Sequence, residues 1–194
     1  GPRDLRALGD AADRAGKAGA LLQGGPGCLA ILLPDLLGLE ELAERLLTTL
    51  AEPAPLRVED GGLLQPGVDA EYDRLVSMRD AGRSHLDGFE QRLRQETGIG
   101  NLKIRHNGML GWYVEVPAAQ EGRVPPDFIR RQGLAGAVRF TTAELQALER
   151  ALGEAADGAQ ARACEIYQAL CQEVLAQAGR LRSAAAALAE LDVA

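Results

Sequence analysis

Two long stretches with helical periodicity enclose a short segment that alternates as β-strands do. The first stretch follows Asp69, and the second begins at Thr141 and continues to Leu191. Both place apolar residues at the 3–4 spacing of a coiled-coil seam. Two such helices bury their stripes most simply by packing antiparallel, with the intervening segment at their far end. The sequence therefore predicts a mainly α fold, a long antiparallel helical lever resembling a coiled coil, with a small antiparallel β insertion at its tip.

Signals for the ends of these helices are clear. Thr97-Gly98 is expected to stop the first helix, and Thr141 with Glu144 matches a capping box that starts the second. Arg79 and Gly82 fall within the first seam and are expected to weaken its middle. The first seam consists of Tyr72, Leu75, Arg79, Gly82, Leu86, Phe89 and Leu93.

Alternation replaces the helical period between the two helices. Lys103, Arg105 and Asn107 fall on one side of a predicted strand, with Leu102, Ile104 and His106 on the other. Asn107-Gly108 is a strong hairpin-turn signal, and the next strand alternates Trp112, Val114 and Val116 with Tyr113 and Glu115. Residues 130–136 are expected to turn or coil once before a last strand at residues 138–140.

The inserted segment is basic although the chain is acidic. Residues 97–142 hold six basic and three acidic side chains, a formal charge of +3, while the whole chain is −7 and its remainder is therefore −10. An acidic scaffold with a basic tip suits contact with a polyanion at one end.

The first third of the chain predicts helices joined by turns. One helix is expected over residues 4–22 and a second from Asp35 until Pro53 and Pro55 end it, followed by an extended linker at 56–66. Gly1-Pro2 is interpreted as the remnant of a removed tag. The expected division is a helical core portion at 1–66, lever helices at 67–96 and 143–194, and an inserted domain at 97–142.

Several kinds of site are disfavoured by the residue patterns. Cys164 and Cys171 lie seven apart on a predicted helix, about 10 Å along its axis, which is too far for a disulfide. The sequence has only two histidines, which disfavours a zinc site with these cysteines. All three cysteines, including Cys28, are therefore interpreted as free thiols. The glycine-rich segment 24–27 lacks the Gly-Lys-Ser/Thr of a phosphate loop. The sequence holds no run of about 20 apolar residues, so no membrane span is predicted.

A family resemblance is carried by several motifs in order along the chain. They are Asp60-Gly61-Gly62-Leu63, Gly67-Val68-Asp69-Ala70-Glu71, the run from Gly98 to Asn107, Gly111 to Val116, Val124-Pro125, Ile129 to Gln132, Arg139-Phe140 and Ala187 to Val193. In this order they resemble the lever and clamp region of the MutS family of DNA mismatch-repair proteins. Gly88-Phe89-Glu90 is similar to the mismatch-reading motif of that family, but its place in the helical seam predicts that Phe89 is a core residue.

The resemblance implies a function. Clamps of this family grip duplex DNA through its backbone without reading sequence, and guanidinium groups bind phosphate bidentately. The resemblance carries DNA contact over to these positions: Lys103, Arg105, Asn107, Arg130, Arg131, Gln132 and Arg139. No enzymatic activity is expected of this chain. It is expected to be a monomeric piece of a longer homodimeric protein, cytoplasmic and associated with the bacterial nucleoid, whose ATPase domain uses ATP and Mg²⁺.

The sequence departs from the family pattern at one turn. The family usually carries Thr, a basic residue and Asn after Arg-Gln, and an acidic residue before the last Arg; here these positions are Gly133, Ala135, Gly136 and Val138. The clamp therefore either binds DNA more weakly or uses neighbouring arginines. Two alternatives stay open: a structural or protein-interaction coiled-coil arm with little DNA affinity, and a homologue that acts on junctions or recombination intermediates.

Overall fold

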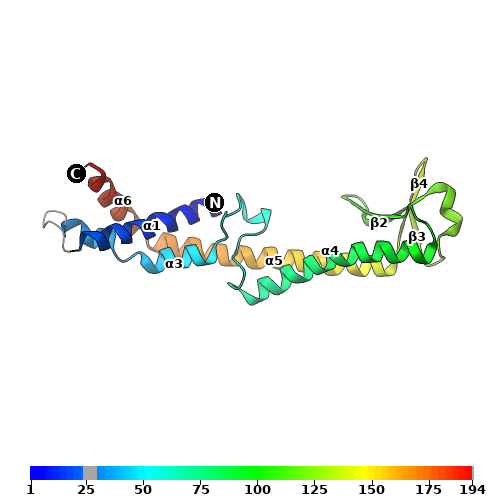
Figure 1. Ribbon diagram of the computed structural model, residues 1–194, viewed down its shortest axis with the longest axis horizontal. Coiled ribbons are helices and arrows are strands. Elements are labelled where there is room, and N and C mark those ends of the chain that lie inside the picture. Colours follow the sequence, from blue (N-terminus) through cyan, green and yellow to red (C-terminus); the bar gives the residue numbers. More distant parts are fainter. Residues whose placement is uncertain (24–29, 194) are drawn as a thin grey trace. The chain divides into compact units, whose positions relative to one another are not determined.

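The computed structural model describes residues 1–23 and 30–193, so Cys28 and the glycine-rich segment 24–27 lie outside the described residues. It divides into two compact units, residues 1–71 with 160–194, and residues 72–159. Helix α5 (Ala143–Ala176) contributes residues to both units. Figure 1 gives the order of the elements along the chain.

The unit made by the two chain ends is helical. It contains α1 (Pro2–Leu22), a 3-10 turn at Ala30–Leu32, α2 (Leu33–Leu36), α3 (Glu40–Thr49), a second 3-10 turn at Val58–Asp60 and α6 (Ala178–Val193). Small residues let α1 approach α3 closely, because a Cβ added at Gly9 would lie 3.0 Å from the Cβ of Leu46. Two further small residues of α1, Ala12 and Ala15, are buried.

Two predicted helices are each divided in the structure. The helix expected from Asp35 breaks between α2 and α3, where Gly38 adopts a φ of 89° that side-chain-bearing residues rarely adopt. The return helix, expected to run unbroken to the chain end, is interrupted at Gln177, whose N–H contacts both the Glu173 and Val174 carbonyls. Beyond it, α6 packs against α1 and α2.

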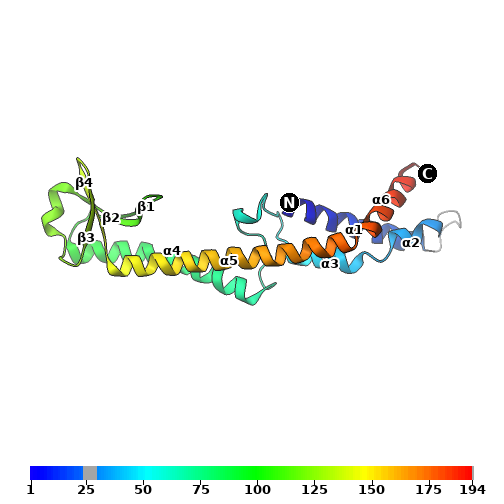
Figure 2. The same cartoon turned by 180° about the vertical axis from the view of Figure 1, so that it is seen from behind.

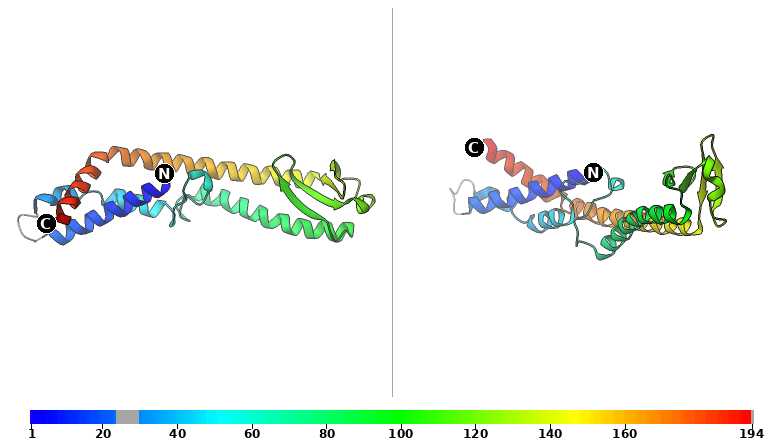
Figure 3. Two further views of the ribbon diagram at one scale, coloured as in Figure 1. Left: turned by 90° about the horizontal axis from the view of Figure 1, so that it is seen from above. Right: turned by 45° about the vertical axis from the view of Figure 1, so that its right-hand side comes forward.

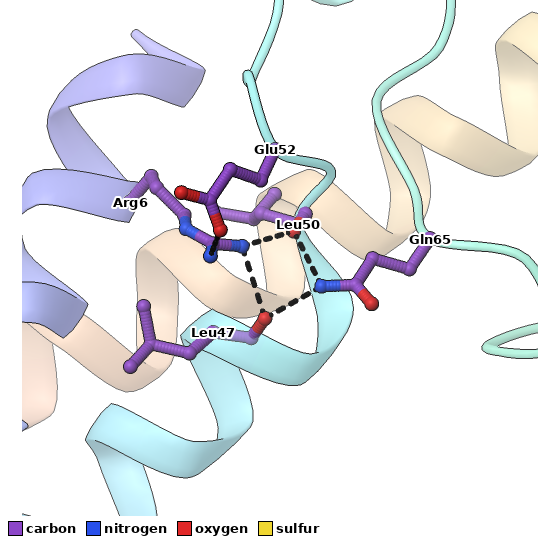
Figure 4. Close-up of polar contacts among 5 residues, drawn as sticks. All are labelled: Arg6, Leu47, Leu50, Glu52 and Gln65. Atoms are coloured by element: carbon purple, nitrogen blue, oxygen red, sulfur yellow. Dashed lines mark hydrogen bonds and ion pairs between the residues drawn. The ribbon is translucent and has the colours of Figure 1, made fainter.

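Side chains from two other segments satisfy the C-terminal carbonyls of α3 (Figure 4). Arg6 Nη1 donates to the carbonyls of Leu47 at 3.0 Å and Leu50 at 2.6 Å. Gln65 Nε2 donates to the same two oxygens, at 2.8 and 3.1 Å. Glu52 pairs with the Arg6 guanidinium. Orphan carbonyls at a helix end need such donors, so these bonds join α1 and the predicted linker to α3.

The other unit is built on α4 (Ala70–Thr97) and the beginning of α5, which lie side by side in both views of Figure 3. Gly82, in the middle of the first seam, lies at a close contact with α5. A Cβ there would lie 2.6 Å from Leu152 Cδ2, so the leucine occupies the space that the glycine leaves. Gly158 accommodates Leu75 in the same way, with both leucine methyls 3.3 Å from its Cβ position.

The helix ends next to the insertion agree with the sequence in one case and differ in the other. Helix α4 ends at Thr97 and Gly98 follows with a φ of 64°. The predicted Thr141–Glu144 capping box is wrong by one residue. Thr142 Oγ1 accepts the Leu145 N–H at 3.1 Å, whereas Thr141 is buried in a strand and Glu144 pairs with Arg92. That pairing raises the pKa of Arg92.

The chain segment that connects α4 to α5 forms one sheet of four antiparallel strands, in the order β1-β2-β4-β3. Figure 2 shows this sheet beside the end of the two helices. They are β1 (Lys103–Asn107), β2 (Gly111–Pro117), β3 (Ile129–Gly133) and β4 (Ala137–Thr141), with a 3-10 segment at Ala118–Arg123 between β2 and β3. The expectation of a turn or coil over residues 130–136 is wrong, because most of it is β3, paired with β4.

One side of this sheet packs on the two helices. Its core contains the strand residues Val114, Val116, Val138 and Phe140 against Leu86, Phe89, Leu93 and Leu145 of the helices, together with Ile99, Leu102 and Phe128. Phe89 is buried, as its place in the seam predicts. Phe128 and Phe140 meet edge to face at 6.1 Å between ring centroids. This core fixes which side of each strand remains available for function.

Candidate nucleic-acid interface

The strand register assigns the polar candidates to one side of the sheet. Lys103 lies opposite Glu115, Arg105 opposite Tyr113, and Glu115 opposite Arg139. These positions alternate with the buried core residues, so they lie on the side away from the helices. We call this side the basic face and define it by Lys103, Arg105, Asn107, Tyr113, Glu115, Gln132 and Arg139.

Glu115 lies at the centre of the basic face. Its Oε1 is 3.1 Å from Arg105 Nε, and its Oε2 is 3.4 Å from Arg139 Nε. Two strands thus bring two guanidinium groups to one carboxylate. The Arg105 side chain is 50% exposed, whereas those of Glu115 and Arg139 are 23% and 19% exposed. The pair is therefore asymmetric, with one arginine accessible and one largely covered.

Arg139 is held from three directions. Its guanidinium carbon lies 4.5 Å from the centroid of the Tyr113 ring, and its Nη1 donates to Gln132 Oε1 at 2.8 Å. Glu115 completes the set. Tyr113 is buried although it belongs to the basic face. These contacts order Arg139 and occupy donors that a phosphate would need.

A bulge in β3 brings Gln132 to the basic face. The register shifts between Arg130 and Gln132, so Arg131 has no partner on β4 and Gln132 lies opposite Arg139. Arg131 is exposed in this bulge. Arg130 lies opposite Phe140, on the register of the packed side, and its Nε is 2.9 Å from Glu121 Oε1.

Asn107 has a structural role at the first hairpin turn. Its Oδ1 accepts the N–H groups of Met109 at 3.0 Å and Leu110 at 2.7 Å. The turn is where Asn107-Gly108 predicts it, but the left-handed residue is Gly111, with a φ of 68°. Lys103, at the other end of the strand, is exposed.

The structure thus gathers Lys103, Arg105, Gln132 and Arg139 on one side of the sheet. It separates Arg130 from them and engages Asn107 in its own turn. Sequence reasoning did not identify Tyr113 and Glu115 as part of the site. Their alternation with buried residues was visible, and pairing the two strands across the Asn107-Gly108 turn would have placed Glu115 beside Lys103.

Other kinds of site find little support in the described residues. Residues 1–23 and 30–193 contain no group of three or more His, Cys, Asp or Glu side chains that could hold a metal ion. Cys164 and Cys171 are free and half-buried, as their spacing predicts. His106 packs against Trp112, with 5.2 Å between ring centroids. Among the helices of the same ranges, none is long and apolar enough to cross a membrane.

The fold and this face define a class of module, a helical hairpin with a small antiparallel sheet inserted between its helices. Residues 67–158 match the model of MutS family domain IV. The chain belongs to the MutS family of DNA mismatch-repair proteins, and this region is its clamp, domain IV.

Curated relatives extend the similarity over the whole chain. The DNA mismatch repair protein MutS of Granulibacter bethesdensis is 42% identical over 195 residues, which cover 99% of this chain and 21% of that protein. The MutS proteins of Ruegeria pomeroyi and Rhizobium meliloti are each 40% identical over 100% of this chain and cover 23% and 22% of those proteins. The chain therefore spans about a fifth of the length of these relatives.

Proposed function

We propose that the basic face binds the backbone of duplex DNA without reading base sequence, as part of a mismatch-repair protein. The observation that carries the proposal is the gathering of Lys103, Arg105 and Arg139 on one side of the sheet. Among the described strand residues of that side, Glu115 is the only acidic one. Arg131 adds an exposed cation at the adjoining bulge.

Phosphate contact is the chemistry that suits these side chains. Arg and Lys neutralise phosphates and release counterions, which gives affinity that depends strongly on salt. Such contacts position a protein on a duplex but carry no sequence information. The accessible candidates are Lys103, Arg105 and Arg131, while Arg139 acts mainly within the face.

The wider role belongs to the same proposal. Residues 97–142 would form the part of the clamp that grips DNA, and 67–96 with 143–194 the lever that couples this grip to an ATPase using ATP and Mg²⁺ in the longer homodimeric protein. The relatives are named as mismatch-repair proteins, which supports this role and a place at the bacterial nucleoid.

Titration of duplex DNA at several salt concentrations tests the proposal. With about three phosphates neutralised, log K should fall with log salt at a slope of about −3, equally for matched and mismatched duplexes. Lys103→Ala should make the slope shallower by about one unit. Lys17→Ala is the matched control, since Lys17 is exposed in the other unit and pairs only locally with Asp13.

The contrary outcome is equally specific. If duplex binding is absent, or if Lys103→Ala and Lys17→Ala alter the slope alike, the basic face does not bind DNA. The module would then be better described as a structural or protein-interaction arm.

A further inference from the structure

The carboxylate at the centre of the basic face has an unexpected position for a DNA-binding surface. An acidic side chain among cations repels phosphate, so Coulomb interaction alone would favour its absence. Yet Glu115 contacts two arginines at once, Arg105 through Oε1 and Arg139 through Oε2. Its geometry explains why the face can tolerate that charge.

Glu115 meets Arg105 at Nε, on the side of the guanidinium. Within residues 1–23 and 30–193, the two terminal nitrogens of Arg105 form no hydrogen bond with the protein, and half of the side chain is exposed. The two terminal guanidinium nitrogens together form one edge through which arginine can bind phosphate bidentately. Glu115 therefore restrains the guanidinium while leaving a phosphate-binding edge accessible.

Arg139 secures the carboxylate from the other side. It is 19% exposed, stacks on Tyr113 and is bonded to Gln132. A cation fixed in this way attracts the Glu115 carboxylate and limits the rotamers that it can adopt. Tyr113 and Gln132 thus hold Arg139 in place. Arg139 holds Glu115, and Glu115 in turn contacts Arg105.

We propose that Glu115 is a positioning residue, which holds Arg105 in the orientation that a DNA phosphate requires, and that Arg139 braces Glu115 without contacting DNA. This inference rests on the proposed function of the basic face. Long arginine side chains lose substantial rotamer freedom when they bind. A face that orders Arg105 in advance meets part of that cost before DNA arrives.

The sign of one substitution separates positioning from simple repulsion. Glu115→Gln removes the negative charge and keeps the side-chain shape. If Glu115 only repels DNA, this variant binds duplex more tightly. If it positions Arg105, the variant binds about threefold more weakly, since one charge-assisted contact is commonly worth that much or more. Its melting temperature, compared with that of the parent chain, checks the fold.

A double-mutant cycle identifies the arginine through which Glu115 acts. With Arg105→Ala, there is nothing left to position, so adding Glu115→Gln should no longer weaken binding and should tighten it slightly by removing repulsion. Arg105→Lys supplies a second test that leaves the charge unchanged. Lysine lacks the Nε contact and the planar fork, so about threefold weaker binding is expected.

Several outcomes would overturn the inference. The first is that Glu115→Gln alone binds duplex DNA more tightly than the unsubstituted chain. The second is that Glu115→Gln weakens binding equally with Arg105 present and with Arg105→Ala. The third is that Arg105→Lys leaves duplex binding unchanged. These results leave the proposed function intact when Lys103→Ala still makes the salt slope shallower. Loss of salt-dependent binding in the parent chain itself would instead overturn both.

Discussion

The two hairpins of the sheet are held in place by different means. The β1–β2 hairpin is tied to both helices through carboxylates. Glu90 of α4 accepts the Ile104 N–H at 2.6 Å, and Glu149 of α5 accepts the Trp112 N–H at 3.1 Å. At the β3–β4 turn the bonds are between backbone groups, from Leu134 N to Ala137 O at 2.8 Å and from Ala118 N to Gly136 O at 3.1 Å.

This difference separates the candidate DNA contacts into two kinds. Lys103 and Arg105 lie on a strand whose backbone is fixed by the helices. Arg131 lies on the other hairpin, in a bulge at the sheet edge. The first kind offers prearranged charge, and the second offers charge that must be ordered during binding. The four altered family positions all belong to the second hairpin: Gly133, Ala135, Gly136 and Val138.

The largest expected effect comes from removing a side chain that both hairpins share. Phe140 pairs with Val114 of β2 and Arg130 of β3, and it is 5% exposed. Phe140→Ala should lower the free energy of unfolding of this unit by about 3–5 kcal/mol, because it leaves a cavity in the core. Urea unfolding measures the loss. A loss below about 1 kcal/mol would mean that the two hairpins do not depend on a common core.

A matched pair of glycine substitutions compares the two turns directly. Gly111 has a φ of 68°, and a Cβ there would collide with the Glu149 carboxylate. Gly111→Ala should therefore cost about 2 kcal/mol of stability. A Cβ at Gly136 would meet nothing within 4 Å, so Gly136→Ala should change stability by less than about 0.5 kcal/mol. Thermal unfolding measures the stability of both variants. Equal losses of stability would contradict the difference expected between the two turns.

Removing one carboxylate that contacts each hairpin gives a smaller contrast. Glu90→Ala leaves the Ile104 N–H without its acceptor and should cost about 1.5 kcal/mol. Glu121→Ala breaks only the exposed pair with Arg130 and should cost no more than about 0.5 kcal/mol. Hydrogen exchange at the Ile104 amide is the sharpest measurement, since only the first variant should accelerate it.

The smallest expected change adds donors to the second hairpin. Gly133→Thr, Ala135→Lys and Gly136→Asn together should strengthen duplex binding by about 1 kcal/mol and steepen the salt slope by about one unit. The Cβ at residue 133 would approach only the flexible end of Arg130, so the fold should persist. If a folded triple variant keeps the parent's affinity and slope, this turn does not face the DNA backbone.

Periodic features were predictable from sequence, and features that depend on pairing between distant segments were not. The seam of α4 and the burial of Phe89 follow from residue spacing alone. Strand β3 was missed because its bulge at Arg131 removes the alternation that marks a strand. The adjacent Thr141 and Thr142 offer equivalent caps, and only the position of β4 decides between them. The role of Glu115 required the register of three strands.

The edges of the sheet have a consequence for how concentrated chains behave. An unguarded edge strand invites pairing with another molecule and can seed aggregation. Helix α4 guards the β1 edge, where Glu90 accepts the Ile104 N–H and Arg94 donates to the Leu102 carbonyl at 2.7 Å. The β3 edge is interrupted by its bulge and carries the exposed Arg130 and Arg131. The same arginines that make this insertion attractive to polyanions therefore make it a poor template for self-association into fibres.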